Sequence, residues 1–400
     1  MFCTLRRSFR LSSVLLIIGS FFQLGIELFI KGKKHLHLVQ DEKFIDFAFR
    51  EFNEAGGETH LFLVIGANQK LRFVKISEIV FVHPRLIWHL LPFAKGHVKS
   101  IFFHSLPSTF HKNLLGRIPN GIPVFWMSWG FDLIEIFGSV DDYVKQKTKL
   151  IVPRKSQSFR KSQNNVDYYR AFKTQPGPDE IANRIDFIST VIEDEYGIIS
   201  PNLYSKRPKW IPWNYFSMEN DVIKGFENEV VSGNNVLLGN SGNFWNNHLD
   251  AFDDLLEFKT SFDQIICPLS YGDQEYRIKV KEKGELVFGK NFVPLNDFLD
   301  YPDYVKRLLS CSHFFINSTR QLALGNILLL LYLGSKVIMD TSNPTFRFFN
   351  RNDIRVFSIA EAKSGQLENV DLDKTRTNLL RIWGKNSIRM KTNNLIQMIS

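Results

Sequence analysis

Residues 237–252, with the sequence LLGNSGNFWNNHLDAF, place a small polar loop between an expected strand and an expected helix. Four residues form this loop: Gly239, Asn240, Ser241 and Gly242. Small residues before a helix can bring backbone N–H groups close to a phosphate, and the helix dipole favours an anion there. Tyr271, after the next expected strand, could form a wall against a nucleobase or sugar. Since many such turns bind nothing, ordinary turns remain the alternative in both places.

A second strand, loop and helix are expected in residues 314–340, FFINSTRQLALGNILLLLYLGSKVIMD. Arg320 lies in this loop. A guanidinium beside a helix N-terminus can stabilise the charge that develops on a departing diphosphate without a metal ion. Gln321, Gly325 and Asn326 occupy the same loop or the first turn of the helix. The alternative is an exposed arginine that precedes a core helix.

In the N-terminal half, the segment FWMSWGFDL places Trp129, Gly130 and Asp132 directly after an expected strand. Asp132 could take a proton from a hydroxyl as a general base, or it could cap the following helix. His104, at the end of another expected strand, is the second candidate base, although a single histidine there is more often structural. The sequence has no metal-ligand cluster, P-loop or G-x-G-x-x-G segment. We therefore expect no metal ion or other cofactor, and hydride transfer and kinase chemistry are disfavoured.

These candidate residues follow short apolar runs that alternate with helix-like stretches, which is typical of parallel α/β sheets. The expected strands are residues 35–39, 60–66, 78–82, 98–104, 122–129, 184–190, 235–240, 263–269, 284–288, 313–317 and 336–340. Residues 206–215 are expected to be an irregular connector. The pattern predicts two facing Rossmann-like domains at 35–210 and 234–400, joined by a linker at 211–233. Since such sheets bind ligands at the carboxyl ends of their strands, the site is expected in the cleft between them.

Length and composition fit this organisation. The chain has 400 residues, of which 44% are apolar and 23% charged, enough for two globular domains. Three scattered cysteines fit a reducing compartment and no disulfide framework. The net charge of +9 is concentrated near the N-terminus and in residues 145–173. Without a nucleic-acid-binding motif, nucleic acid is an unlikely partner, and an anionic membrane surface or a solvated basic helix fits better.

Residues 1–34 are expected to be an extension outside the fold. Residues 11–30, LSSVLLIIGSFFQLGIELFI, are about long enough to span a hydrocarbon core as a helix. Gln23 and Glu27 interrupt the apolar run, and an expected strand begins at His35. A transmembrane or interfacial anchor, a signal sequence and an over-extended translation start all remain open. We expect a separate hydrophobic helical segment.

Several motifs together carry a family resemblance. LLGNSGNFWNNHL, ICPLSYGDQEY and VFWMSWGFDL, with FFHS and RQLALGNILLLLYLGSKVIMD as weaker points, resemble glycosyltransferase family 56 in order and spacing. This family comprises the TDP-N-acetylfucosamine:lipid II N-acetylfucosaminyltransferases, also described as 4-α-L-fucosyltransferases. The similarity extends from about residue 35 to 360. Asn243, where the family often has Asp, and Ser105 depart from the pattern.

The resemblance implies a GT-B fold, a dTDP-activated acetamido-deoxyhexose donor and a polyprenyl-diphosphate-linked saccharide acceptor. It also implies work at the cytoplasmic face of the bacterial inner membrane, peripherally or through the N-terminal segment. By motif, donor binding falls on Gly239, Asn240, Ser241, Gly242, Tyr271, Arg320, Gln321 and Asn326, and acceptor or catalytic work falls near His104, Trp129 and Asp132. A transferase that uses a UDP- or GDP-sugar and a noncatalytic nucleotide- or polysaccharide-binding protein remain the alternatives.

Overall fold

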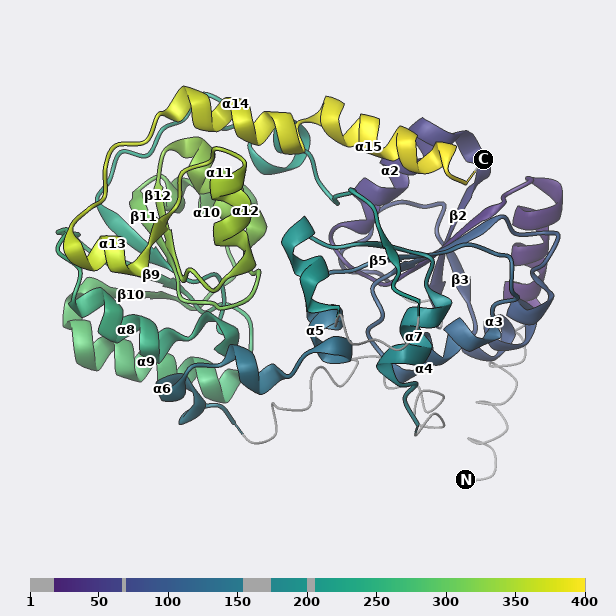
Figure 1. Cartoon of the computed structure of the whole chain (residues 1–400), viewed down its shortest axis with the longest axis horizontal. Coiled ribbons are helices and arrows are strands. Elements are labelled where there is room, and N and C mark those ends of the chain that lie inside the picture. The colour runs from purple at the N-terminus through teal and green to yellow at the C-terminus, as the bar shows by residue number, and fades with distance from the viewer. Residues whose placement is uncertain (1–17, 67–69, 154–173, 200–205, 400) are drawn as a thin grey trace. The chain divides into compact units, whose positions relative to one another are not determined.

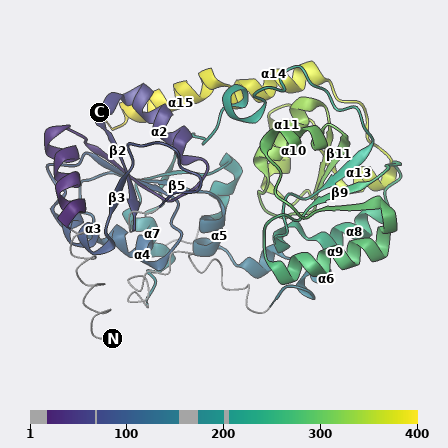
Figure 2. The ribbon, with the colours of Figure 1, turned by 180° about the vertical axis from the view of Figure 1, so that it is seen from behind.

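The computed structural model describes residues 18–66, 70–153, 174–199 and 206–399, and the chain divides into two compact units. Unit 1 contains Met1–Phe137, Ser162–Phe216 and Ile388–Ser400, and unit 2 contains Gly138–Lys161 and Ser217–Ser387. Figures 1 and 2 show a sheet with flanking helices in each unit. The expected α/β class with parallel sheets is confirmed.

Unit 1 is built on a seven-stranded parallel sheet with the order β3-β2-β1-β4-β5-β6-β7. Its strands are β1 (His35–Val39), β2 (His60–Ile65), β3 (Val80–Val82), β4 (Ser100–His104), β5 (Val124–Met127), β6 (Phe187–Ser189) and β7 (Lys209–Trp210). Its helices include α2 (Ile45–Gly56), α3 (Pro84–Leu90), α4 (Thr109–Leu114), α5 (Phe131–Phe137) and α7 (Pro178–Arg184).

Both faces of the unit 1 sheet are buried, which explains why its strands read as continuous apolar runs. Alternate residues of β1 serve the two faces: Leu36 and Leu38 belong to one apolar cluster, and Val39 belongs to the other. The second cluster is completed by α2 and by α15 (Lys385–Gln397), the last helix of the chain, which lies beside α2 in Figures 1 and 2. Arg389 of α15 forms an ion pair with Glu51 of α2 at 3.2 Å.

Unit 2 is built on a six-stranded parallel sheet with the order β10-β9-β8-β11-β12-β13. Its strands are β8 (Asn235–Leu238), β9 (Ile265–Pro268), β10 (Phe292–Leu295), β11 (Cys311–Ile316), β12 (Lys336–Met339) and β13 (Phe357–Ser358). Its helices include α6 (Gln146–Lys149), α8 (His248–Leu256), α9 (Gln274–Phe288), α10 (Tyr301–Leu308), α11 (Leu324–Leu333), α12 (Pro344–Arg351), α13 (Ile359–Ser364) and α14 (Leu372–Trp383).

Three expectations about the organisation are wrong. Residues 284–288 end α9 instead of forming a strand, and the strand is β10, which begins at Phe292. The helix continues through Gly284, and the Phe292 ring packs on this glycine, where an added Cβ would lie 2.4 Å from Cζ of the ring. The irregular connector contains β7, a short edge strand. The domain limits at 35–210, 211–233 and 234–400 also change, because residues 138–161 belong to unit 2 and residues 388–400 to unit 1.

The N-terminal helix is part of unit 1 where the structure describes it. Residues 18–25 are helical, and a π-helical turn follows at Ile26–Ile30. Leu24 lies in the apolar cluster of unit 1 and is 5% exposed, and Leu28 packs against this cluster. The prediction of a separate segment is therefore wrong for these residues, and residues 1–17 lie outside the description. None of the helices in the described parts of the chain has the length and apolar character needed to cross a membrane.

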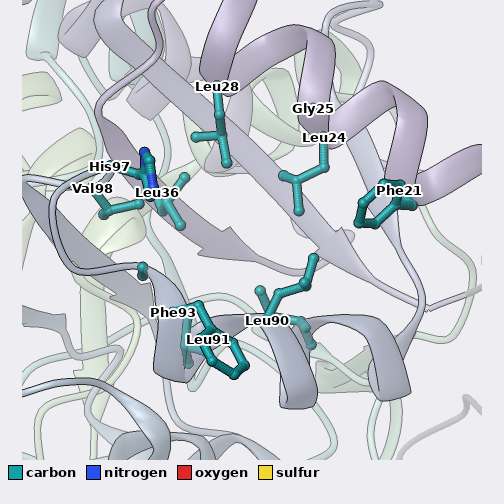
Figure 3. A pocket seen from close by; sticks show the side chains of 12 residues that line it. Phe21, Leu24, Gly25, Leu28, Leu36, Leu90, Leu91, Phe93, His97 and Val98 are labelled. Carbon is teal, nitrogen blue, oxygen red and sulfur yellow. The ribbon is translucent and has the colours of Figure 1, made fainter.

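An apolar cavity of about 270 Å³ lies between this helix and the region of α3. Figure 3 shows Phe21, Leu24 and Leu28 on the helix opposite Leu90 and Phe93. Phe21 and Phe93 line the cavity and are exposed, and three further apolar side chains of the helix are exposed as well: Ile18, Phe22 and Ile26. The helix therefore presents apolar side chains both to the core of unit 1 and to solvent.

Candidate functional site

The predicted donor residues gather at one edge of the unit 2 sheet. Strands β9, β8 and β11 are neighbours and run parallel, so the loops that follow them leave the sheet at the same edge. The loop after β8 contains Asn240, the loop after β9 contains Tyr271, and the loop after β11 contains Arg320. The three sequence motifs that were predicted separately therefore converge.

The first two loops contact each other directly. The Gly242 N–H donates to the Tyr271 carbonyl at 2.8 Å, and Gly242 and Gly272 form a parallel bridge outside the strands. The side-chain amide of Asn240 donates to the Tyr271 hydroxyl at 3.3 Å. Tyr271 is 50% exposed, so part of its ring remains accessible beside Asn240.

The structure contradicts the physical reason for expecting a phosphate at the backbone of this loop. The Gly239 N–H donates to the Phe315 carbonyl at 3.0 Å, and the Asn240 N–H donates to Oδ1 of Asn246 at 3.2 Å. Because the Gly242 N–H donates to the Tyr271 carbonyl, three of the four backbone N–H groups expected to bind phosphate already have acceptors in the protein. These glycines serve close loop packing instead: Gly239 has a φ of +65°, and an added Cβ would lie 2.8 Å from Oδ1 of Asn246.

We expect the Gly272→Ala variant to lower the free energy of unfolding of unit 2 by about 1–3 kcal/mol. Gly272 has a φ of +123°, and an added Cβ would lie 2.2 Å from the Gly242 carbonyl oxygen, so both strain and a backbone clash arise. Urea unfolding measures the change. Gly325→Ala is the matched control because Gly325 is exposed and an added Cβ would have no atom within 4 Å. Equal stability of the two variants would contradict this account of the loop contact.

Arg320 is buried beside the loop that follows β8. Its side chain is 3% exposed, and the guanidinium carbon lies 4.0 Å from the centre of the Trp245 ring. Its Nε donates to the Gln321 carbonyl at 3.1 Å. The alternative of an exposed arginine is therefore wrong. The stack places a positive charge in a poorly hydrated position at this edge of the sheet, where electrostatic interactions are strengthened.

The remaining donor candidates differ in their surroundings. Ser241 is buried, and its carbonyl accepts a hydrogen bond from the Asn246 side chain at 3.0 Å. Gln321 is 5% exposed, so its side chain has little accessible surface. Asn326 donates to the Tyr304 hydroxyl at 2.8 Å, and Gly325 is exposed in the first turn of α11. Gly325 and Tyr271 are therefore the more accessible members of the predicted set.

Part of the basic stretch at residues 145–173 is engaged within unit 2. Lys145 donates to Asp340 at 2.5 Å and also to Asn317, residues that directly follow β12 and β11. Lys147 forms an ion pair with Asp253. These contacts give both lysines protein partners, so the prediction that they contact lipid headgroups loses its support here. Residues 154–173 of the stretch lie outside the described residues.

In unit 1, Asp132 is a fully buried anchor of the loop that precedes α5. Its Oδ2 accepts from the Leu106 N–H at 3.0 Å and from Nε1 of Trp126 at 2.8 Å. Its Oδ1 accepts from the Ser128 hydroxyl at 2.9 Å and from the Trp129 N–H at 3.0 Å. This geometry favours the helix-capping alternative, because a carboxylate enclosed by donors offers no accessible oxygen to a substrate hydroxyl.

His104, the last residue of β4, is also fully buried. Its Nδ1 forms a hydrogen bond with the Tyr215 hydroxyl at 2.8 Å, and burial lowers its pKa to about 3. Tyr215 in turn lies 5.8 Å from Trp129 and 6.0 Å from Phe44, measured between ring centres. His104 and the predicted acceptor residue Trp129 are thus brought together by Tyr215.

Phe44, Trp129 and Tyr215, here called the aromatic cluster, are half-buried and lie in loops of unit 1 that follow strands. Gly130, the other predicted acceptor residue, follows Trp129 with a φ of +81° and turns the chain into α5. Aromatic rings of this kind provide apolar faces for the C–H groups of a sugar. Sequence reasoning missed Tyr215 because its segment was interpreted as a connector, although its aromatic content was a signal.

Among the residues that the structure describes, no three His, Cys, Asp or Glu side chains are grouped so that they could hold a metal ion. Cys267 and Cys311 are buried and free, and they lie in β9 and β11.

Comparison with solved structures shows that the fold is shared with glycosyltransferases. A glycosyltransferase from Rickettsia africae has 13% identity and a TM-score of 0.58 over 92% of this chain and 98% of that one. A lipopolysaccharide outer core galactosyltransferase has 10% identity and a TM-score of 0.56 over 91% and 99%. An Anabaena protein in complex with UDP and glucose has 11% identity and a TM-score of 0.55 over 92% and 98%.

Sequence comparison finds a family model that matches the C-terminal part of the chain. The sequence model described as 4-alpha-L-fucosyltransferase glycosyl transferase group 56 matches residues 214–397, which include the loops that carry Asn240, Tyr271 and Arg320. The chain is a glycosyltransferase, and its residues 214–397 match glycosyl transferase group 56, the family that its motifs resemble.

Proposed function

We propose that the enzyme transfers an acetamido-deoxyhexose from a dTDP-activated donor to a saccharide carried on polyprenyl diphosphate. The observation that carries this proposal is the convergence of the loops after β8, β9 and β11, with Arg320 against Trp245, inside the segment that matches the family. Such an edge of a parallel sheet is where nucleotides bind in doubly wound domains.

On the donor side, unit 2 offers the two kinds of interaction that a nucleoside diphosphate needs. The partly exposed Tyr271 ring can stack on a nucleobase, and the neighbouring Asn240 amide can donate hydrogen bonds. The buried charge of Arg320 and the N-terminal turn of α11 favour the negative charge of the diphosphate. Because bond cleavage increases the charge on the diphosphate, these groups favour the transition state over the bound donor.

On the acceptor side, unit 1 offers the aromatic cluster. Its rings suit the apolar face of a saccharide, and the Tyr215 hydroxyl lies among them. Asp132 positions this surface, because its carboxylate accepts the Trp129 N–H and thereby fixes the backbone of the loop.

The proposal is tested with the purified full chain and a panel of dTDP-, UDP- and GDP-sugars, with and without EDTA. A polyprenyl-diphosphate-linked saccharide serves as acceptor. We expect transfer only from a dTDP-acetamido-deoxyhexose, and we expect EDTA to leave the rate unchanged. A faster rate with a UDP- or GDP-sugar would overturn the donor assignment. Nucleotide binding without turnover of any donor would indicate the noncatalytic alternative.

We also propose that the enzyme works peripherally at the cytoplasmic face of the inner membrane. The exposed apolar side chains of the N-terminal helix and of Phe93 support this location, because exposed apolar side chains on a helix are characteristic of interfacial helices. Lys33 and Lys34 follow the helix and carry charge that favours anionic headgroups.

We expect the double variant Phe22→Ser, Phe93→Ser to bind anionic phospholipid vesicles at least tenfold more weakly than the unaltered protein. Phe22 is 65% exposed and Phe93 is 76% exposed, and each loses apolar area that would enter the bilayer. Co-sedimentation with vesicles measures the change. Phe298→Ser in unit 2 is the matched control, because Phe298 is 72% exposed and lies away from the cavity lining. Equal loss in both proteins would contradict this membrane face.

A further inference from the structure

A line of hydrogen-bonded side chains crosses the interior of unit 1. Nδ1 of His60 lies 2.8 Å from Nε2 of His37, and Nδ1 of His37 lies 2.9 Å from Nε2 of His104. Nδ1 of His104 lies 2.8 Å from the Tyr215 hydroxyl, which is 3.4 Å from the Met127 carbonyl. No sequence motif predicted this line, because its members come from β2, β1, β4 and the segment after β7.

The line runs from the amino ends of the strands to their carboxyl ends. His60 is the first residue of β2, His37 is central in β1, and His104 is the last residue of β4, and all three strands are parallel. Tyr215 ends the line within the aromatic cluster at the carboxyl edge. The hydrogen bonds therefore connect the proposed acceptor side of unit 1 with the amino edge of its sheet.

The rings are enclosed by apolar groups. His37 is stacked between Phe62 and Phe102, with ring centres 4.2 and 4.4 Å away. Burial lowers the pKa of His60 and of His104 to about 3, so both rings are neutral near pH 7. A neutral imidazole has one N–H and one lone pair, and therefore each ring can donate on one side only if it accepts on the other.

This restriction makes the three rings change together. Either every Nδ1 carries the proton and the Tyr215 hydroxyl accepts from His104, or every Nε2 carries it and Tyr215 donates to His104. A shift of one proton along each hydrogen bond converts the first arrangement into the second without creating a charged ring. Such coupled networks are more than a sum of separate pairs.

We propose that Tyr215, His104, His37 and His60 form a proton relay that removes the proton of the acceptor hydroxyl during glycosyl transfer. The inference rests on the proposed function. The acceptor O–H gives its proton to the Tyr215 oxygen as the oxygen bonds to the sugar carbon and the sugar's bond to the diphosphate breaks. Tyr215 passes its own proton to Nδ1 of His104, whose Nε2 proton moves to Nδ1 of His37. The Nε2 proton of His37 moves to Nδ1 of His60, and the Nε2 proton of His60 leaves to water.

The far end of the relay is shaped for this last step. Nε2 of His60 is buried and has no hydrogen-bond partner among the described residues, and an added Cβ at Gly56 would lie 2.5 Å from it. Gly56 ends α2, and the next residues, Gly57 and Glu58, are exposed. Because Gly56 has no side chain, Nε2 is separated from the exposed turn by little more than the glycine backbone.

The decisive experiment measures transfer by the full chain with His37→Phe, which keeps an aromatic ring between Phe62 and Phe102 but removes both hydrogen bonds. We expect kcat to fall on the order of 100-fold, with the KM for the donor unchanged, because proton removal contributes to the chemical step. The matched control is His35→Phe. His35 lies on the same strand and stacks on His60 at 4.8 Å, but its hydrogen bond goes to Ser100 outside the relay.

A folded His37→Phe protein with the kcat of the unaltered enzyme would overturn the relay. Should His37→Phe not fold, Tyr215→Phe keeps every ring and must show the same loss of kcat.

Nitrogen NMR of the unaltered protein supplies a readout that needs no activity. All three histidines must carry the same tautomer, and a mixture of Nδ1–H and Nε2–H rings would contradict the relay. If no donor supports transfer at all, the proposed function fails while the tautomer measurement still judges the coupled line.

Discussion

Asp132→Asn lowers the free energy of unfolding of unit 1 by about 3–5 kcal/mol, the expected cost of breaking a buried charged hydrogen-bond network. Each carboxylate oxygen has donors of its own. Oδ2 accepts from the Leu106 N–H and the Trp126 indole, and Oδ1 accepts from Ser128 and Trp129. An amide converts one of these oxygens into an NH₂ group, so donors would face donors at a fully buried position.

Urea unfolding monitored by tryptophan fluorescence measures this loss, since Trp126 is itself a partner of the carboxylate. Glu58→Gln is the matched control, because Glu58 is an exposed carboxylate of the same unit. We expect the control to change stability by less than about 0.5 kcal/mol. An Asp132→Asn protein of normal stability with a strongly reduced kcat would instead support the general-base interpretation that the sequence motif also allowed.

Arg320→Ala reduces kcat/KM on the order of 1000-fold, the upper range for loss of one group that stabilises developing charge. Arg320 is 3% exposed and its guanidinium stacks on Trp245, so its charge acts in a poorly hydrated region. Because an anion gains from this charge before and during bond cleavage, both the affinity for dTDP and kcat fall. Calorimetry with dTDP and steady-state rates measure the two effects separately.

Two variants control this result. Arg320→Lys keeps the charge but loses the planar stack on Trp245, and we expect an intermediate loss. Arg307→Ala removes an exposed arginine from the end of α10, which precedes the amino end of β11, and we expect unchanged kinetics. Unchanged turnover of a folded Arg320→Ala protein would remove Arg320 from the proposed mechanism.

Most of the fold was predictable because buried parallel strands leave a strong local pattern. HLHLV and HFFIN are short apolar runs bounded by polar residues; the first is β1, and the second includes the last four residues of β11. The strand predicted at residues 284–288 is wrong because a local apolar pattern does not by itself distinguish a strand from a helix. GELVF is apolar enough for a strand, but it ends α9, and its Gly284 packs on the Phe292 ring, a tertiary contact that no local pattern records.

The candidate site was predictable only in part, for a related reason. Loops that follow strands can be recognised by their glycine, asparagine and arginine residues, and the converging loops of unit 2 were predicted in this way. The internal use of the Gly239 and Gly242 N–H groups depends on neighbouring strands, so sequence alone gave the residues but a wrong role for their backbone. The histidine line is a stronger case. His37, His60 and His104 lie on three strands, and only the register of the sheet shows that they touch.

The path of the chain also constrains how the protein can be made. The last helix supplies Ile388 and Leu395 to the apolar cluster of unit 1, whose other members include Phe47 and Phe52 near the beginning of the chain. During synthesis, Phe47 and Phe52 leave the ribosome long before Ile388 and Leu395, so their apolar surface stays exposed in the meantime. A protein shortened by its final thirteen residues would keep every strand of both sheets, yet it would expose one face of unit 1 and become prone to aggregation during synthesis.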